Sequence, residues 1–149
     1  MFEIVRTNTE NQDFLQLVKS LDAELLSING EDHIFYGPLN KLDTVKHVVV
    51  VYENSCPLAC GAMREYIDDV MEIKRMYTSP PARGRRIASH VLTELERWAV
   101  ELSYRKCILE TGKRLPAAIT LYMRHGYKRV DNYGSYRGDD NSVCFEKKL

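Results

Sequence analysis

One stretch of the sequence, Val70–Leu92, constrains the fold more than any other. It begins as an apolar segment with β-branched and aromatic residues, which predicts a buried strand. Pro80 and Pro81 end this strand at about Ser79, because proline offers no N–H to a sheet ladder. From Ile87 onward the apolar residues recur at helical spacing on one face. The stretch is therefore predicted to form a strand, a short loop and a helix.

The loop between this strand and this helix carries Arg83, Arg85 and Arg86. It leads into a helix N-terminus, where unpaired backbone N–H groups and the helix dipole favour an anion. We expect these N–H groups from about Arg85 to Ala88, with the arginines adding positive charge around them. A solvated basic loop or a weak nucleic-acid patch is the alternative. The position between a strand end and a helix start favours a cradle for phosphate groups.

The cradle belongs to neither of the commonest types, because the sequence contains no G-x-x-x-x-G-K-[ST] and no G-x-G-x-x-G. Residues 72–88 resemble instead the coenzyme A site of the GNAT superfamily of N-acetyltransferases. There, a strand ending in a hydrophobic-x-Pro step is followed by R-G-x-G-[IL]-[GA] at the start of a helix. The matching residues here are Thr78-Ser79-Pro80 and Arg83-Gly84-Arg85-Arg86-Ile87-Ala88. The resemblance continues through Leu121-Tyr122-x-x-x-Gly126-Tyr127 and covers most of the chain from about Val48.

This resemblance implies a single domain over residues 1–149, of mixed α/β (α+β) class. A central mixed, mostly antiparallel sheet would be flanked by helices on both faces. It also implies acetyl-CoA as cosubstrate, no metal, and direct transfer of the acetyl group to a primary amine in a ternary complex. The acceptor would be a small amine or amino acid, or a protein amine. A non-catalytic acyl-CoA-binding module that regulates a partner is the alternative.

The resemblance implies that the cofactor contacts nine residues of the strand end and the loop, namely Met76, Tyr77, Thr78, Arg83, Gly84, Arg85, Arg86, Ile87 and Ala88. A bulge or splay near Met76 and Thr78 would free backbone groups to pair with pantetheine. Arg86 departs from the family pattern, which has glycine there. Its side chain either crowds the phosphates or returns its guanidinium to them, and we favour the second.

Two side chains are candidates for the chemistry. An amine with a pKa near 10.4 arrives protonated at neutral pH, so a base or a water route is required. Glu72 is the candidate base, because the resemblance implies a catalytic glutamate at its place on the strand. Alternatively, it is a strand-face charge paired with Lys74 or Arg105. Tyr122 is the candidate acid for the departing thiolate, or else a core residue beside Trp98.

The acceptor pocket is less well defined. By resemblance it involves the regions 22–40 and 132–137, whose candidate amine contacts are Asp22, Glu24, Tyr36, Tyr133 and Tyr136. The alternative for each of them is an ordinary surface residue with no role in acceptor binding. The four histidines show no metal-ligand spacing, and the acidic pairs at 68–69 and 139–140 indicate turns.

The rest of the chain supplies the other elements of the fold. Further strands are predicted at 2–6, 45–52, 58–66, 106–110, 127–131 and 142–147. Helices are predicted at about 86–103 and from Pro116 to Gly126. A first helix would begin at a capping box, Thr9-x-x-Gln12, and end near Gly30. Residues 30–44 are predicted to be a short helix or a loop.

Composition sets the remaining expectations. The chain has 149 residues with 21 basic and 21 acidic side chains, which argues against a nucleic-acid or membrane-surface binder. No signal peptide or membrane span is read, so we expect a cytoplasmic protein. Four cysteines without C-x-x-C spacing are expected to be buried reduced thiols. The sequence leaves open whether the chain forms a homodimer.

Overall fold

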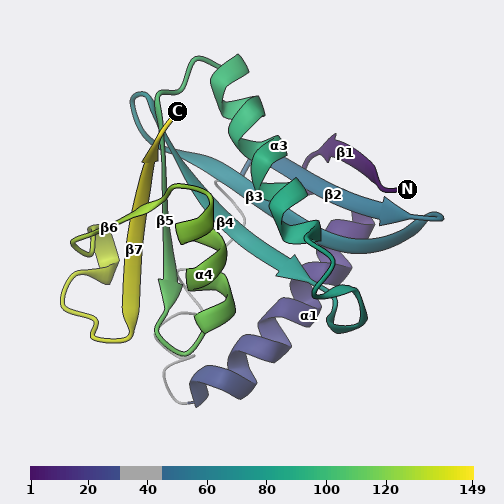
Figure 1. Cartoon of the computed structure of the whole chain (residues 1–149), viewed down its shortest axis with the longest axis horizontal. Coiled ribbons are helices and arrows are strands. Elements are labelled where there is room, and N and C mark those ends of the chain that lie inside the picture. Colours follow the sequence, from purple (N-terminus) through teal and green to yellow (C-terminus); the bar gives the residue numbers. More distant parts are fainter. Residues whose placement is uncertain (31–44) are drawn as a thin grey trace.

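The computed structural model describes residues 1–30 and 45–149, whose strands form a single seven-stranded sheet in the order β1-β2-β3-β4-β5-β7-β6 (Figure 1). All neighbouring strands are antiparallel except β4 and β5, which are parallel. The predicted mixed, mostly antiparallel sheet is therefore confirmed. The strands are β1 (Glu3–Thr7), β2 (His47–Glu53), β3 (Cys56–Ile67), β4 (Val70–Thr78), β5 (Lys106–Gly112), β6 (Lys128–Val130) and β7 (Ser142–Lys148).

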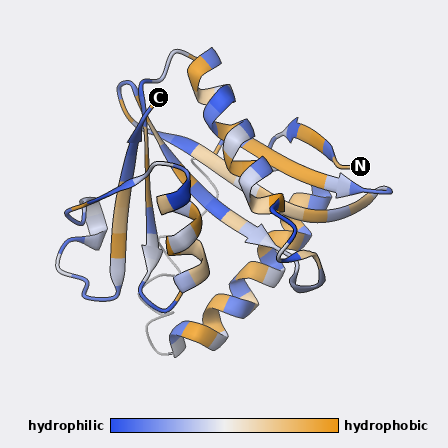
Figure 2. Cartoon of the chain, viewed as in Figure 1, coloured by the Kyte–Doolittle hydropathy of each residue, from blue (hydrophilic) through white to orange (hydrophobic). Residues whose placement is uncertain are grey.

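Helices cover both faces of the sheet, which the residues of β2 make plain. Val48 and Val50 pack with α1 (Gln12–Asn29), whereas Val49 and Val51 pack with α3 (Ile87–Glu101) and the other core residues of the opposite face. A strand covered on both sides has apolar residues in succession, as the continuous orange of β2 in Figure 2 shows. The shorter helix α4 (Pro116–Arg124) lies on the α3 side (Figure 1).

The ends of α1 show one correct and one wrong prediction. Gly30 lies at the C-terminus with φ 57°, as expected for a glycine that ends a helix. The capping box from Thr9 to Gln12 does not form. The N-cap is Asn11, whose side chain accepts a hydrogen bond from the Phe14 N–H at 2.9 Å. Asparagine is among the best N-cap residues, so the helix begins two residues later than the box implies.

The sheet and α3 approach each other closely at Gly61 on β3. A Cβ there would lie 2.5 Å from the Met76 sulfur and 2.6 Å from a Val91 methyl group. Only glycine leaves room for these two side chains, which fill the space beneath the helix. Because Met76 belongs to the end of β4, this close packing also fixes the strand from which the site is built.

The parallel pair β4–β5 opens towards one end. Its pairing runs from Val70↔Lys106 to Ile73↔Leu109 and then stops, although both strands continue. Just beyond the last pair, Arg75 has φ 60° and the register between β3 and β4 shifts, which marks a β-bulge. The predicted interruption of β4 is thus present, and it leaves a gap between two central strands.

Most predicted boundaries agree with the structure. The strand predicted from Val70 is β4, which covers 70–78 as expected, and the helix predicted at 86–103 is α3. The strand predicted at 106–110 extends to Gly112. The prediction for residues 30–44 falls almost wholly outside the described residues.

Candidate active site

The N-terminus of α3 is open to a ligand. The helix begins at Ile87, and within the described residues the N–H groups of Ile87, Ala88 and Ser89 make no hydrogen bond. Arg86 is the N-cap, and its side chain does not cap the helix. Gly84 has φ 82° and Arg86 has φ 61°, so both lie in the left-handed region that favours glycine. The loop therefore turns as a two-glycine loop would, with an arginine in the second place.

The three loop arginines differ in their partners. Arg83 donates to the Thr78 carbonyl and binds Glu24 at 2.7 Å, which ties the loop to α1. Arg85 binds Glu53 at 2.7 Å. Among the described residues no ion pair is found for Arg86, which is exposed. Arg86 is therefore the loop arginine best able to turn towards an anion.

The end of β4 presents a free strand edge between the loop and the gap. Met76 packs among the α3-side core residues, and Tyr77 packs among those of the α1 side. Tyr77 and Thr78 are paired with β3. Met76, Tyr77 and Thr78 all lie beyond the last pairing of β4 with β5. Backbone groups on the β5 side are thus available for an added strand-like ligand.

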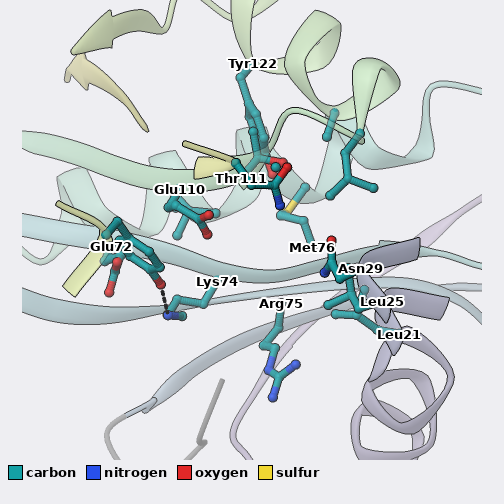
Figure 3. Close-up of a pocket in the computed structure, with 16 residues that line it drawn as sticks. Leu21, Leu25, Asn29, Glu72, Lys74, Arg75, Met76, Glu110, Thr111 and Tyr122 are labelled. Atoms are coloured by element: carbon teal, nitrogen blue, oxygen red, sulfur yellow. Dashed lines mark hydrogen bonds between the residues drawn. The ribbon is translucent and has the colours of Figure 1, made fainter. Parts of the chain in front are cut away.

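A cavity of about 130 Å³ opens where β4 and β5 part. It is lined from both faces of the sheet, by α4 on one side and by α1 on the other (Figure 3). In this view Tyr122 reaches from α4 towards Thr111 and Met76, and Arg75 points away from them. The lining includes Leu21, Leu25, Asn29, Glu72, Lys74, Met76, Glu110, Thr111, Tyr122 and Tyr136. A cavity of this size fits the reacting end of a substrate.

Glu72 lies in the wall of this cavity and is 1% exposed. Arg64 on β3 donates to one carboxylate oxygen at 2.6 Å, and the Tyr133 hydroxyl donates to the other at 2.5 Å. The pairing partner expected from sequence, Lys74 or Arg105, is therefore not the one observed. Burial is the main cause that raises the pKa of Tyr133, with the Glu72 charge second. The tyrosine consequently stays protonated and keeps donating to the carboxylate.

Glu110 on β5 is a second carboxylate in the same cavity, and sequence reasoning missed it. The Ser142 hydroxyl lies 2.8 Å from one of its oxygens. Burial raises the pKa of Glu110 to about 7, against the opposing effects of the Ser142 hydrogen bond and the Lys74 charge. A carboxyl group with this pKa exchanges protons readily at neutral pH. The available signal was a carboxylate in an otherwise apolar strand, whereas Glu72 was selected by its place in the family resemblance.

Tyr122 is 5% exposed and lines the cavity from α4. Its ring contacts Tyr127 and Phe145, so it fills core as well, although beside these residues and not beside Trp98 as the alternative supposed. No hydrogen bond of its hydroxyl is found within the described part of the chain. Burial raises the pKa of Tyr122, which keeps the hydroxyl protonated at neutral pH.

Of the five candidate acceptor contacts, Tyr133 already donates its hydroxyl hydrogen bond to Glu72. Asp22 binds Arg75 and Glu24 binds Arg83, so both acidic groups already have a cation. Tyr36 lies outside the described residues. Tyr136 lines the cavity, where its hydroxyl accepts from Lys74 at 3.2 Å.

The described cysteines are free thiols that differ in burial. Cys60, Cys107 and Cys144 are buried free thiols as expected, whereas Cys56 is exposed. Among residues 1–30 and 45–149, no group of three His, Cys, Asp or Glu side chains could hold a metal ion. None of the described helices is long and apolar enough to cross a membrane.

Comparison with known proteins identifies the family. The model of the acetyltransferase (GNAT) family matches residues 14–127, so the chain belongs to this family. The chain is also 27% identical over 150 residues to the IAA acetyltransferase of Azospirillum brasilense, a match that covers 98% of this chain and 97% of that protein. The predictions of family, fold class and enzyme class are confirmed.

Solved structures share the fold over the whole chain. One from Klebsiella pneumoniae, assigned to the acyl-CoA N-acyltransferases, has a TM-score of 0.82 and 29% identity and covers 100% of this chain and 98% of that one. A GNAT family acetyltransferase from Elizabethkingia anophelis with acetyl-CoA bound has a TM-score of 0.71 and 14% identity. That match covers 99% of this chain and 98% of the other, and at this identity it shows the fold alone.

Proposed function

We propose that this N-acetyltransferase moves an acetyl group from acetyl-CoA to a primary amine that binds in the cavity between β4 and β5. The observation that carries the proposal is the gap beyond Ile73 and Leu109. It joins a strand edge and an open helix N-terminus on one side to a buried polar cavity on the other. An acyl donor and an amine can therefore meet there without a covalent intermediate on the protein.

The residues present fit acetyl-CoA. The free N–H groups at the start of α3 and the exposed guanidinium of Arg86 suit the pyrophosphate. The unpaired edge at Met76 and Thr78 suits the two amides of pantetheine. The cofactor supplies the acetyl group as a thioester, which is an activated acyl donor. The acetyl-CoA bound to the Elizabethkingia relative supports this assignment.

The chain's own residues would handle the protons. Tyr122, kept protonated by burial, is placed to donate to the departing thiolate. The sequence-based assignment of Glu72 as the base, acting through water, stays a prediction. Both of its carboxylate oxygens already accept a hydrogen bond, from Arg64 and Tyr133. This arrangement suits a fixed negative charge beside an ammonium group at least as well as a base.

An amine panel with thiol detection tests the proposal. The panel contains small amines, amino acids and peptides with free α-amines or lysines, and IAA because the Azospirillum relative carries its name. We expect thiol release that depends on one class of acceptor, with the acetylated product confirmed by mass. Binding of acetyl-CoA without transfer to any acceptor would contradict the proposal.

A further inference from the structure

We propose that Glu110 takes the proton from the acceptor ammonium group and that Ser142 and Asp139 carry it to solvent. This proton route rests on the proposed function, because it needs an amine bound in the cavity. It assigns the role of base to Glu110 instead of Glu72, the residue that the family resemblance indicates.

The position of Glu110 follows from the strand pairing. The last pair of β4 and β5 is Ile73↔Leu109, so Glu110 is the first β5 residue beyond it. Glu110 points to the same side as Ile108, two residues before it, and Ile108 is paired with Glu72. Both carboxylates therefore lie on the α1 face, but Glu110 lies at the mouth of the gap. In Figure 3 it lies between Tyr122 and Lys74.

Ser142 connects Glu110 to a second carboxylate. Its hydroxyl oxygen lies 2.8 Å from Glu110 Oε2 and 2.8 Å from Asp139 Oδ2. A hydroxyl has one proton, so it can donate to only one carboxylate at a time. The second short contact is favourable only when the other carboxyl group is protonated and donates to the hydroxyl oxygen. The three groups thus form a chain that holds one proton in addition to that of the serine.

The chain leads from the cavity to the surface. Ser142 is 2% exposed, whereas Asp139 is partly exposed in the loop before β7. Asp139 is held in place by the backbone, because one carboxylate oxygen accepts from the Asn141 N–H at 3.0 Å. Its other oxygen remains directed at Ser142. A proton that reaches Asp139 can pass to water.

The protons balance along this route. The ammonium N–H bond breaks as an O–H bond forms on Glu110, and the neutral amine attacks the thioester carbon. Asp139 releases to water the proton that the chain already holds. Glu110 then gives its proton to the Ser142 oxygen while the Ser142 proton moves to Asp139, which restores the starting state. The second proton that the nitrogen loses leaves with the thiol of coenzyme A, through Tyr122. One proton is released to solvent for each acetyl group transferred.

The charged and titratable groups around Glu110 set how readily it exchanges. Lys74 on β4 lowers the pKa of Glu110, and so does the Ser142 hydrogen bond. The charges of Asp139 and Glu72 raise that pKa, and burial raises it most. Tyr122 and Tyr136 also face the carboxyl group, and burial raises the pKa of each, so both stay neutral. Removal of Ser142 or Asp139 should therefore move the titration of Glu110 in opposite directions.

The first test needs no acceptor. Side-chain ¹³C carboxyl shifts of the glutamates are followed by NMR against pH in the wild-type enzyme, and Glu110→Gln identifies the Glu110 resonance. We expect Glu110 to titrate near pH 7. Titration of Glu110 below about 5, the range of ordinary glutamates, would overturn the proposal without bearing on acetyl transfer itself.

The second test uses the amine that the panel identifies. Glu110→Gln should lower kcat/KM on the order of a hundredfold at pH 7, with recovery as free amine accumulates at high pH. Ser142→Ala should move the rising limb of the pH profile to higher pH, and Asp139→Asn should move it to lower pH, each by about half a pH unit or more. Asp140→Asn, the exposed neighbour, is the matched control and should leave the limb in place.

The outcomes separate the two proposals. If wild-type enzyme acetylates no amine, the proposed function fails whatever Glu110 does. If Glu110→Gln keeps the wild-type profile while Glu72→Gln loses activity and recovers at high pH, Glu72 is the base and the Glu110 route is wrong. Shifts of the limb in the same direction in Ser142→Ala and Asp139→Asn would also overturn it, because loss of the hydrogen bond and loss of the negative charge should change the pKa of Glu110 in opposite directions.

Discussion

The two faces of the sheet meet at the gap between β4 and β5 but are built in different ways. On the α3 side the site consists mainly of backbone, namely the end of β4 and the start of α3, which are close in sequence. On the α1 side it consists of buried ionisable side chains from β3, β4, β5 and the segment around β7. A helix N-terminus tolerates many side chains, whereas a buried carboxylate depends on each partner. Substitutions on the α1 side should therefore have the larger effects.

The largest effect is expected from Glu72→Ala. Its loss leaves Arg64, whose side chain is 30% exposed, without its carboxylate. Breaking one side of a buried pair costs about 3 to 5 kcal/mol, which urea unfolding can measure. Glu53→Ala is the control from the other side, because it breaks a solvent-exposed pair with Arg85 and should change stability little. Equal losses in the two variants would remove the distinction between the faces.

The next effect concerns Glu110 and depends on pH. Its native pKa of about 7 lies above the ordinary value of 4.5, so the folded state keeps a proton that the unfolded state has released. Wild-type stability is therefore lost as pH rises from about 5 to 8, and Glu110→Gln escapes this loss. Over that range, the unfolding free energy of the variant minus that of the wild type should increase by roughly 3 kcal/mol. A difference that is constant with pH would show that Glu110 titrates normally.

The same contrast explains what could be read from the sequence. Val70–Thr78 is found as predicted because its apolar pattern and Pro80 are local signals. The partner of Glu72, by contrast, cannot be predicted from its neighbours in the sequence. A two-residue turn at 68–69 with unbroken pairing would place Glu65 opposite Glu72. The register shift between Glu65 and Ile67 places Arg64 there instead.

Glu110 was missed for a related reason. In the sequence it closes the apolar run before Thr111 and looks like the end of a strand. Its raised pKa comes from burial, and its hydrogen-bond partner Ser142 lies 32 residues later, where only the β5–β7 pairing brings the two near. The predicted Arg86 cradle, by contrast, needed only neighbours in sequence. Local patterns therefore predicted the loop and the helix start at Arg86, whereas the buried carboxylate contacts depend on tertiary pairing.

Tyr122→Phe should separate chemistry from binding across the gap. Phenylalanine keeps the ring contacts with Tyr127 and Phe145 but removes the proton donor. We expect kcat to fall about tenfold or more, with acetyl-CoA affinity by calorimetry within a few-fold of wild type. A fully active variant would return Tyr122 to a packing role.

The smallest effect is expected on the cofactor side, from Arg86→Gly. Glycine adopts φ 61° freely, so the loop should keep its shape and the fold should not lose stability. Loss of one partly exposed charge-assisted contact is worth roughly 1 kcal/mol, which predicts about a fivefold rise in KM for acetyl-CoA and little change in kcat. Arg97→Ala, at an exposed site in the middle of α3, is the control. Tighter binding in the glycine variant would mean that Arg86 crowds the phosphates.

The central claim is that donor and acceptor occupy opposite faces and react directly through the gap. Burial raises the pKa of Cys60 and Cys107 to about 12 and that of Cys144 to about 11, so these thiols are poor nucleophiles. The most direct test is the initial velocity of the wild-type enzyme with both substrates varied. Double-reciprocal lines that intersect are the predicted result, because both substrates must be bound together. Parallel lines would indicate an acetylated enzyme and would contradict direct transfer.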